Sequence, residues 1–278
     1  MVAAPTASKL SLQCEAIGTD TTTLRSLDWD RSRFDIEFGL RNGTTYNAFL
    51  IRGERTALVD TSHAKFRDTW IPLLKQQIDP CDIDVLIVSH TEPDHSGLIG
   101  DLLDLNPDLE IVGSKVALQF LKDQVHRPFQ SRAVKTGEEL DLGTNPESGA
   151  EHRIEFLSAP NLHWPDTIFS FDHGSGILFT CDAFGLHYCS DEVFDRDPGA
   201  IAPDFRFYYD CLMGPNARSV LQALKRMDAL PTINTIAVGH GPLLRDHLSH
   251  WVNDYREWSG QRSKGERYAA VCYLSQYG

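Results

Sequence analysis

The sequence has no pair of cysteines at the CxxC spacing of structural zinc sites and redox-active disulfides. Its six cysteines are scattered along 278 residues, at Cys14, Cys81, Cys181, Cys189, Cys211 and Cys272. This scatter argues against a disulfide framework and a cysteine-based zinc site. We therefore expect all six to be reduced thiols, mostly packed in the core, in a cytosol-like compartment.

Basic side chains and long apolar runs are also scarce. Lysine and arginine number 26 against 39 aspartate and glutamate residues, a formal net charge of −13, whereas a nucleic-acid-binding surface needs a basic face. No apolar run approaches the roughly 20 residues of a membrane-spanning helix. The first residues, MVAAPTASKL, lack the charged and apolar regions of a secretory signal. We expect a cytoplasmic protein with no membrane insertion and no nucleic-acid partner.

The chain does have the composition of a globular protein, with 41% hydrophobic and 23% charged residues. Short apolar runs alternate with helical patterns, which is typical of a layered α/β domain. The predicted strands cover residues 46–52, 56–60, 84–89, 153–158, 167–171, 177–180 and 235–238. The predicted helices cover residues 63–77, 97–105, 114–124, 214–228 and 246–258. Residues 1–25, polar and rich in Thr and Ala, are predicted to form an extended arm, and residues 143–151 a surface loop.

Four of the predicted strands lead into side chains that can bind a metal ion. The sequences are DVLIVS before His90, IEFLSAPNL before His163, GILFTC before Asp182 and TIAVG before His240. Taken singly, a histidine or aspartate after a strand is usually a turn residue or a helix cap. Loops that leave the same ends of strands converge on one crevice in an α/β sheet, so four such strand ends together favour a metal site.

The segment SHTEPDHSG holds four potential metal ligands within six residues. They are His90, Glu92, Asp94 and His95. Four ligands so close together are too many for one small cation, and they favour two cations a few ångströms apart. The three later side chains would complete both sets of ligands, and Asp182, with two carboxylate oxygens, is the best candidate for a bridge.

The predicted ligands are four imidazoles and three carboxylates, with no thiolate. This set is harder than the cysteine-rich sites that zinc and copper(I) prefer, and it favours iron or manganese. The carboxylate charges would also stabilise cations that change oxidation state, which zinc does not do. Two alternatives remain open: a binuclear zinc hydrolase, and a non-catalytic partner subunit whose site is empty.

The motif resembles that of a known superfamily. Metallo-β-lactamase-like hydrolases carry HxHxDH, and SHTEPDHSG resembles this motif with Glu92 in place of the second histidine. That replacement resembles the flavodiiron proteins, which reduce dioxygen or nitric oxide at a non-haem di-iron centre. APNLHWPDTIFSFD, LFTCDAFGLHYCSD and AVGHGP are similar to flavodiiron sequence in the same order, and LRSLDWDRSRFDIEFGLRNGTTYNAFLI resembles the branch of oxygenic phototrophs. The resemblance covers residues 24–278 and implies a metallo-β-lactamase-like αββα sandwich.

The resemblance also implies how the ligands divide between two irons. One iron would be bound by His90, Glu92 and His163. The other would be bound by Asp94, His95 and His240. Asp182 would bridge both, and Glu92 and Asp182 would be the catalytic residues. All seven positions hold the residue type that the family pattern requires.

The family further implies a substrate, an electron supply and partners. The substrate would be dioxygen, or nitric oxide, reduced with electrons from FMN that NAD(P)H or a ferredoxin-type donor supplies. The protein would form a homodimer, or a heterodimer with a related flavodiiron protein, in a cyanobacterial cytosol or chloroplast stroma.

The final residues AAVCYLSQYG resemble the first strand and phosphate loop of a flavodoxin domain. We expect residues 26–265 to form the di-iron domain, and residues 266–278 to be a linker and the start of a truncated flavodoxin-like domain. FMN would then belong to the full-length protein and not to this chain.

Other side chains carry weaker signals. His187 is expected either to contact a metal ligand or to have a structural or surface role. Trp164 and Tyr188 are candidates to line an oxygen pocket, and His63 is expected at a helix cap. The histidines at positions 126, 152, 173, 247 and 250 are assigned no role.

Overall fold

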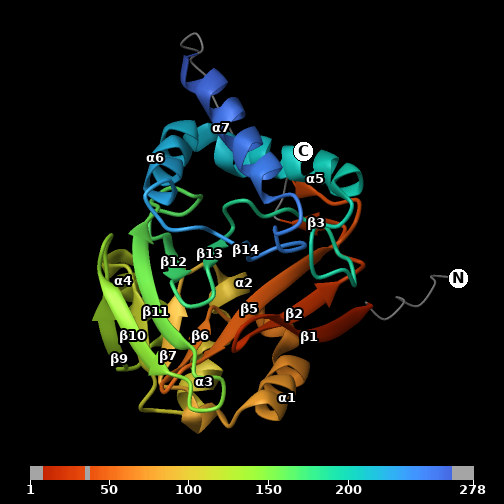
Figure 1. Cartoon of the computed structure of the whole chain (residues 1–278). Helices are drawn as coiled ribbons and strands as arrows, with labels where there is room; N and C mark the ends of the chain where they lie inside the picture. The colour runs from red at the N-terminus through yellow and green to blue at the C-terminus, as the bar shows by residue number, and fades with distance from the viewer. Residues whose placement is uncertain (1–8, 35–37, 265–278) are drawn as a thin grey trace, which may run out of the picture.

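Two β-sheets face each other at the centre of the molecule, and helices cover their outer faces (Figure 1). The computed structural model describes residues 9–34 and 38–264. The larger sheet contains, in spatial order, β1 (Leu10–Gly18), β2 (Thr21–Asp28), β5 (Thr44–Arg52), β6 (Thr56–Val59), β7 (Val85–Val88), β8 (Glu110–Gly113) and β9 (Gln130–Ala133). The smaller sheet contains β10 (Glu139–Thr144), β11 (Glu151–Ser158), β12 (Ile168–Asp172), β13 (Ile177–Cys181) and β14 (Thr235–Val238). A separate short hairpin pairs β3 (Arg33–Phe34) with β4 (Phe38–Gly39).

The helices divide between the two outer faces. The larger sheet is covered by α1 (Arg67–Gln77), α3 (Ile99–Leu105) and α4 (Lys115–Val125), and the one-turn helix α2 (Pro93–Ser96) lies in the loop after β7. The smaller sheet is covered by α5 (Pro198–Tyr208), α6 (Ala217–Met227) and α7 (Leu248–Lys264). Short turns of 3-10 helix occur at η1 (Ala64–Phe66), η2 (Pro80–Asp82) and η4 (Gly214–Asn216), and a π-helical turn at η3 (Tyr209–Met213).

Alternation of side chains along the strands builds two hydrophobic cores. In β5, Ala48 and Leu50 pack against the helices of the larger sheet, whereas Phe49 and Ile51 face the smaller sheet. Successive side chains of a strand point to opposite faces, so a strand covered on both faces must be apolar throughout. The result is four layers, helix, sheet, sheet and helix, so the predicted αββα sandwich is confirmed.

The predicted N-terminal arm is wrong over residues 10–25. β1 pairs with β2 along its whole length, and β2 pairs with β5, so this segment completes the larger sheet. Threonine, a β-branched residue that favours strands, is what makes this stretch look polar. Thr21, Thr23 and Arg25 are buried, because neighbouring strands and loops supply them with hydrogen-bond partners. The predicted segment 266–278 lies outside the described residues.

The seven predicted strands and five predicted helices correspond to observed elements with ends shifted by one or a few residues. The strands β8, β9 and β10 and the helix α5 were not predicted. β8 and β9 have only four residues each, too short for a clear period, and their pairing partners are distant in sequence. Within the described ranges, no helix is long and apolar enough to cross a membrane.

Candidate metal centre

Seven donor side chains from four loops meet at one end of the facing sheets. Each loop follows a strand: β7 leads to residues 90–95, β11 to His163, β13 to Asp182 and β14 to His240. β11, β13 and β14 run in the same direction, so their loops leave the smaller sheet at the same edge. The structure therefore brings all seven predicted ligands together, in two groups of mutually close donor atoms.

The one-turn helix α2 and its flanks are held by buried hydrogen bonds. Pro93 occupies the first turn, where its missing N–H leaves no hydrogen bond unmade. The carbonyl oxygen of His95 accepts hydrogen bonds from the N–H and the hydroxyl of Thr61, at 2.7 and 2.6 Å. Asp166 accepts from the N–H and the hydroxyl of Thr91, both at 2.9 Å. The backbone that carries four of the donors is thus fixed from two directions.

Asp182 stands between the two groups, and its two carboxylate oxygens face different histidines. Oδ2 lies 3.1 Å from Nε2 of His90 and 3.1 Å from Nε2 of His163. Oδ1 lies 3.1 Å from Nε2 of His95 and 3.4 Å from Nε2 of His240. A carboxylate that bridges two ions needs this arrangement.

Glu92 completes the first group. Its Oε2 lies 2.9 Å from Nε2 of His163 and 3.4 Å from Nε2 of His90. The Glu92 and His163 side chains keep 13% and 20% of their surface exposed, whereas His90 is fully buried. The first group therefore opens toward solvent through Glu92 and His163.

Asp94 completes the second group, which is enclosed. Its Oδ2 lies 3.2 Å from Nε2 of His240 and 3.6 Å from Nε2 of His95, and these two nitrogens are 3.1 Å apart. Neither Asp94 oxygen makes a hydrogen bond of normal geometry within the described residues, although the side chain is buried. A buried carboxylate without hydrogen bonds is unfavourable unless a cation offsets its charge.

The turn that carries His240 is held by β5 of the other sheet. Nδ1 of His240 donates to the carbonyl oxygen of Thr45 at 2.6 Å, which leaves the lone pair on Nε2, facing the other donors. The Thr45 hydroxyl accepts from the N–H of Gly241 at 2.8 Å. The Asn47 amide donates to the carbonyl oxygens of Val238 and Gly241 at 2.9 and 3.0 Å. Hydrogen bonds that orient an imidazole from behind strengthen its binding to a metal.

The carboxylates and imidazoles stabilise each other's charged forms. Burial by itself raises the pKa of Asp182, but His90 and His95 lower this pKa well below its usual value. Burial lowers the pKa of His163, and hydrogen bonds to Asp182 and Glu92 more than reverse this effect and raise it to about 9. A metal ion competes with the imidazole protons for the same lone pairs, so binding one releases protons.

The spacing of the donors fits metal ions. Two donors that each lie about 2.1 Å from one ion are about 3.0 Å apart at a right angle and about 3.4 Å apart at the tetrahedral angle. The distances from histidine Nε2 atoms to carboxylate oxygens in the two groups run from 2.9 to 3.6 Å. Imidazole and carboxylate donors suit iron, manganese or zinc. The residues present therefore fit a pair of such ions.

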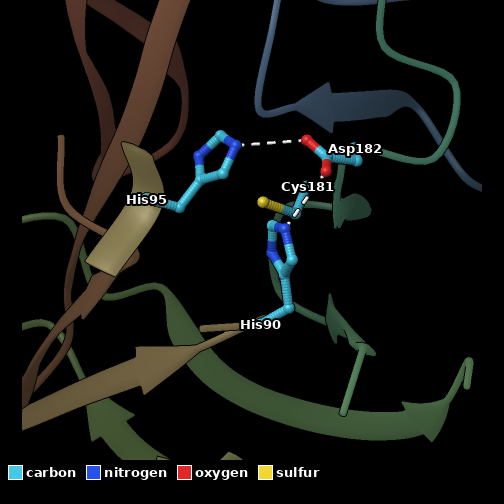
Figure 2. Close-up of side chains that lie close together, drawn as sticks. All are labelled: His90, His95, Cys181 and Asp182. Atoms are coloured by element: carbon cyan, nitrogen blue, oxygen red, sulfur yellow. Dashed lines mark hydrogen bonds and ion pairs between the residues drawn. The ribbon is translucent and has the colours of Figure 1, made fainter. Parts of the chain in front are cut away.

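Cys181 is a donor in this pocket that was not predicted. Its thiol forms a third group of close donor atoms with His90, His95 and Asp182 (Figure 2). Cys181 ends β13 with a φ of 51°, and the pairing with β14 shifts register between Phe179 and Cys181. Strand alternation would turn the thiol away from the side on which Asp182 lies, but a bulged, left-handed strand end breaks that alternation. The pocket thus contains a thiol, although the seven predicted ligands do not.

His187 lies behind His240, where it contacts a predicted ligand. The two ring centroids are 4.8 Å apart, and His187 Nδ1 lies 2.9 Å from the hydroxyl of Thr44. Burial, followed by the charge of His240, keeps the pKa of His187 well below its usual value. The buried His187 ring therefore packs against the second group, and a surface role is excluded.

Aromatic side chains surround the donors. The Trp164 and His90 rings are in an edge-to-face arrangement with centroids 6.1 Å apart, so Trp164 lies beside the first group. Tyr188 instead lines a separate hollow of about 280 Å³ with Phe194. Tyr208 was not predicted, yet its ring centroid lies 6.4 Å from that of His240, and its buried hydroxyl has no hydrogen-bond partner in the described part of the chain.

Other expected features lie away from the pocket. His63 caps η1 by accepting the N–H of Lys65 at 3.0 Å, as predicted. Five of the six cysteines fall within the described residues and are free thiols, and Cys272 lies outside them. Glu139, Glu155 and His173 form a partly exposed donor group on the smaller sheet, but Arg153 already pairs with Glu139.

Comparison with known proteins places the chain in a family. A family model described as ODP family beta lactamase matches residues 44–241, which include all seven predicted ligands. Diflavin flavoprotein A 1 of Synechocystis sp. (strain PCC 6803) is 60% identical over 274 residues, which cover 99% of this chain and 47% of the relative. The chain thus spans about half the length of the curated relatives it matches.

Solved structures agree with this relationship. The metal-soaked Flv1 flavodiiron core from Synechocystis sp. PCC6803 is 34% identical and superimposes with a TM-score of 0.85 over 92% of this chain and 62% of that chain. Rubredoxin oxygen:oxidoreductase from Desulfovibrio gigas is 28% identical, with a TM-score of 0.82 over 90% of this chain and 62% of that chain. The chain therefore belongs to the ODP family of β-lactamase-like domains, and its fold is that of the flavodiiron cores.

Proposed function

We propose that the chain is the di-iron core of a flavodiiron oxidoreductase that reduces dioxygen to water. His90, Glu92 and His163 would bind one iron, and Asp94, His95 and His240 the other. The observation that carries the proposal is the position of Asp182, whose two oxygens face the two groups separately. The relative described as rubredoxin oxygen:oxidoreductase supports dioxygen as the substrate, with nitric oxide as the second candidate.

The chain's own residues would prepare the site for redox chemistry. Three carboxylates offset the charge of two cations, and burial excludes bulk water from all donors except Glu92 and His163. Reactants would therefore enter on the side of Glu92 and His163. Asp182 and Glu92 would be the carboxylates closest to the reaction, since they border that entrance and the junction of the two groups.

Two irons held by these residues would supply two of the four electrons that reduction of dioxygen to two waters requires. The remaining electrons must come from another group. The relative's name, diflavin flavoprotein, supports a flavin as that donor, with NAD(P)H or a ferredoxin-type protein upstream. We propose the same electron supply for the full-length form of this protein, as a homodimer or with a related flavodiiron chain.

The proposal is tested by loading the metal-free chain with ferrous iron under anaerobic conditions. We expect two irons per chain, a Mössbauer spectrum of a spin-coupled pair, and rapid oxidation of both irons when dioxygen is mixed in a stopped-flow cell. Asp182→Asn should lose the coupled spectrum, because an amide cannot replace a bridging carboxylate. A zinc-loaded chain that hydrolyses esters or lactams, with iron unable to bind as a pair, would contradict the proposal and support the hydrolase alternative.

A further inference from the structure

A second set of four donors overlaps the two groups described above. The ligand atoms of His90, His95, Cys181 and Asp182 all lie within 4.8 Å of one another, and all four residues are buried (Figure 2). Figure 2 shows the sulfur of Cys181 directed into the space between the two imidazoles. The set consists of one histidine from each group, the shared Asp182 and the polarisable sulfur of Cys181.

The spacing and charge of these donors match one tetrahedral ion. An ion with bonds of about 2.0–2.3 Å places its ligands roughly 3.3–3.8 Å apart. The four ligand atoms lie within 4.8 Å of one another, and Nε2 of His90 and Nε2 of His95 lie 3.1 Å from Oδ2 and Oδ1 of Asp182, respectively. Side-chain movements of about 1 Å would therefore bring them to the spacing around one ion. One thiolate and one carboxylate balance the charge of one divalent ion, which a buried site requires. Two imidazoles, a thiolate and a carboxylate are donors that zinc accepts.

The backbone makes room for the thiol at this place. Gly239 packs against Cys181, and a Cβ on Gly239 would come 3.1 Å from Cys181 Sγ and 2.7 Å from His95 Cε1. The left-handed φ of Cys181 turns its side chain toward the same cavity as Asp182. Both features keep the sulfur among the donors.

We propose that the pocket has a second mode of metal binding, in which one zinc-like divalent ion is held by His90, His95, Cys181 and Asp182. Binding forms a metal–sulfur bond and releases the thiol proton to solvent, with no change of oxidation state. The single ion uses one histidine from each group and the bridging carboxylate. It therefore excludes the pair of ions, and zinc would block the site for iron.

The test uses cobalt(II), whose complexes with thiolate show an intense near-ultraviolet charge-transfer band that imidazole and carboxylate complexes lack. The metal-free chain is titrated with cobalt(II), and bound metal is measured by elemental analysis. We expect the first equivalent to bring in the thiolate band, and zinc to displace the cobalt at a ratio of one ion per chain.

Three variants separate this mode from the two-ion mode. Cys181→Ser should abolish the band and weaken binding of the first ion by about tenfold or more. Cys189→Ser removes a buried thiol that belongs to none of the donor groups, and should change neither the band nor the affinity. His163→Ala removes a donor used only by the pair, and should keep the thiolate band while preventing a second ion from binding. Circular dichroism confirms that each variant is folded.

The outcomes decide the proposal independently of the iron chemistry. Loss of the band in Cys181→Ser alone supports the thiolate site, whether or not the iron-loaded chain reacts with dioxygen. Two cobalt ions bound without a thiolate band, or no cobalt bound at all, would overturn it. The proposal would also be overturned if the Cys181→Ser chain bound zinc as tightly as the unchanged chain.

Discussion

At the scale of single residues, a glycine beside the donors leaves the space that the His95 ring occupies. Gly239 precedes His240, and a Cβ at this position would come 2.7 Å from Cε1 of His95. We predict that Gly239→Ala displaces the His95 ring and weakens binding of the ion held by Asp94, His95 and His240 by about tenfold or more. Anaerobic titration with iron(II) measures this affinity. Gly100→Ala in α3 is the control, since its added Cβ meets nothing within 4 Å. Equal metal affinities in the two variants would contradict the prediction.

A second residue-scale prediction concerns His152, which joins the two sheets. His152 Nδ1 lies 2.8 Å from Asp172 in β12, and Nε2 lies 3.3 Å from Asp20 in the β1–β2 turn. The hydrogen bond to Asp172 raises the pKa of His152, although burial opposes this effect. The pKa of Asp172 is lowered: burial alone would raise it, but the hydrogen bonds from His152 and Ser175 outweigh that effect.

The sign of the pH dependence follows from these shifts. The histidine contribution is complete below its unfolded pKa of about 6.5 and is lost as pH rises through the raised folded value. The aspartate contribution is present above about pH 3.8 and is lost as pH falls through the lowered folded value. We predict that His152→Asn reduces the free energy of unfolding by about 1–3 kcal/mol near pH 5.5, with a smaller loss above pH 8. Urea denaturation at several pH values measures this, and a pH-independent difference would refute it.

At the scale of elements, β5 connects the metal pocket to the larger sheet. The Asn47 amide donates a hydrogen bond to the carbonyl oxygen of Val238, which lies 191 residues further along the chain. Its Oδ1 accepts a hydrogen bond from Nε of the buried Arg25 at 3.3 Å. The amide can adopt only one orientation, because the flipped form would place its oxygen against two carbonyl oxygens. β5 thus sets where the loop after β14 lies.

We predict that Asn47→Asp selectively weakens binding of the metal ion in the second group. The aspartate cannot donate to the carbonyl oxygens of Val238 and Gly241, so the turn that carries His240 should shift. We expect binding of the ion held by Asp94, His95 and His240 to weaken about 10–100-fold, as measured by anaerobic isothermal titration with iron(II).

The matched control for this change is Asn106→Asp. Asn106 is also a buried amide that donates to two carbonyl oxygens, those of Pro80 and Ile83, at 3.1 and 2.9 Å. It differs from Asn47 in its place, because it follows the last residue of α3 and binds the segment around η2. Both variants should lose about 1–3 kcal/mol of stability, and only Asn47→Asp should lose metal affinity. Equal loss in both would mean that Asn47 acts only through stability.

At the scale of the whole molecule, the proposed metal ions would tie the two sheets together. The segment 90–95 follows a strand of the larger sheet, whereas His163, Asp182 and His240 follow strands of the smaller one. An ion that binds only the folded chain stabilises it by about 2.7 kcal/mol when its free concentration is 100 times Kd. We predict that a chelator lowers Tm by roughly 5–10 °C, measured by scanning calorimetry. Asp182→Asn should show little chelator-dependent shift, and an unchanged Tm in the unmodified chain would count against metal binding.

Much of the pocket could be predicted from local sequence. The four donors of SHTEPDHSG are close together because they lie within six consecutive residues. Pro93 begins the one-turn helix α2, which includes Asp94 and His95. Strand runs such as TIAV and ILFTC are apolar apart from one threonine each, which is typical of strands buried on both faces. β2 was missed because the threonines that favour a strand also make it look polar, and β1 was missed because Ser11, Gln13 and Glu15 give that segment a polar appearance.

The sequence by itself determined the family and the layered α/β class, and it predicted the seven donor side chains that the structure brings together. Each of these depends on short segments whose residues can be interpreted without knowing the rest of the fold. Only the tertiary structure decided that Asp182 faces both groups, that Cys181 points among the donors, and that His187 packs behind His240. These facts depend on a left-handed strand end and on contacts such as that of Asn47 with Val238. Such contacts join residues far apart in the chain, and no local pattern specifies them.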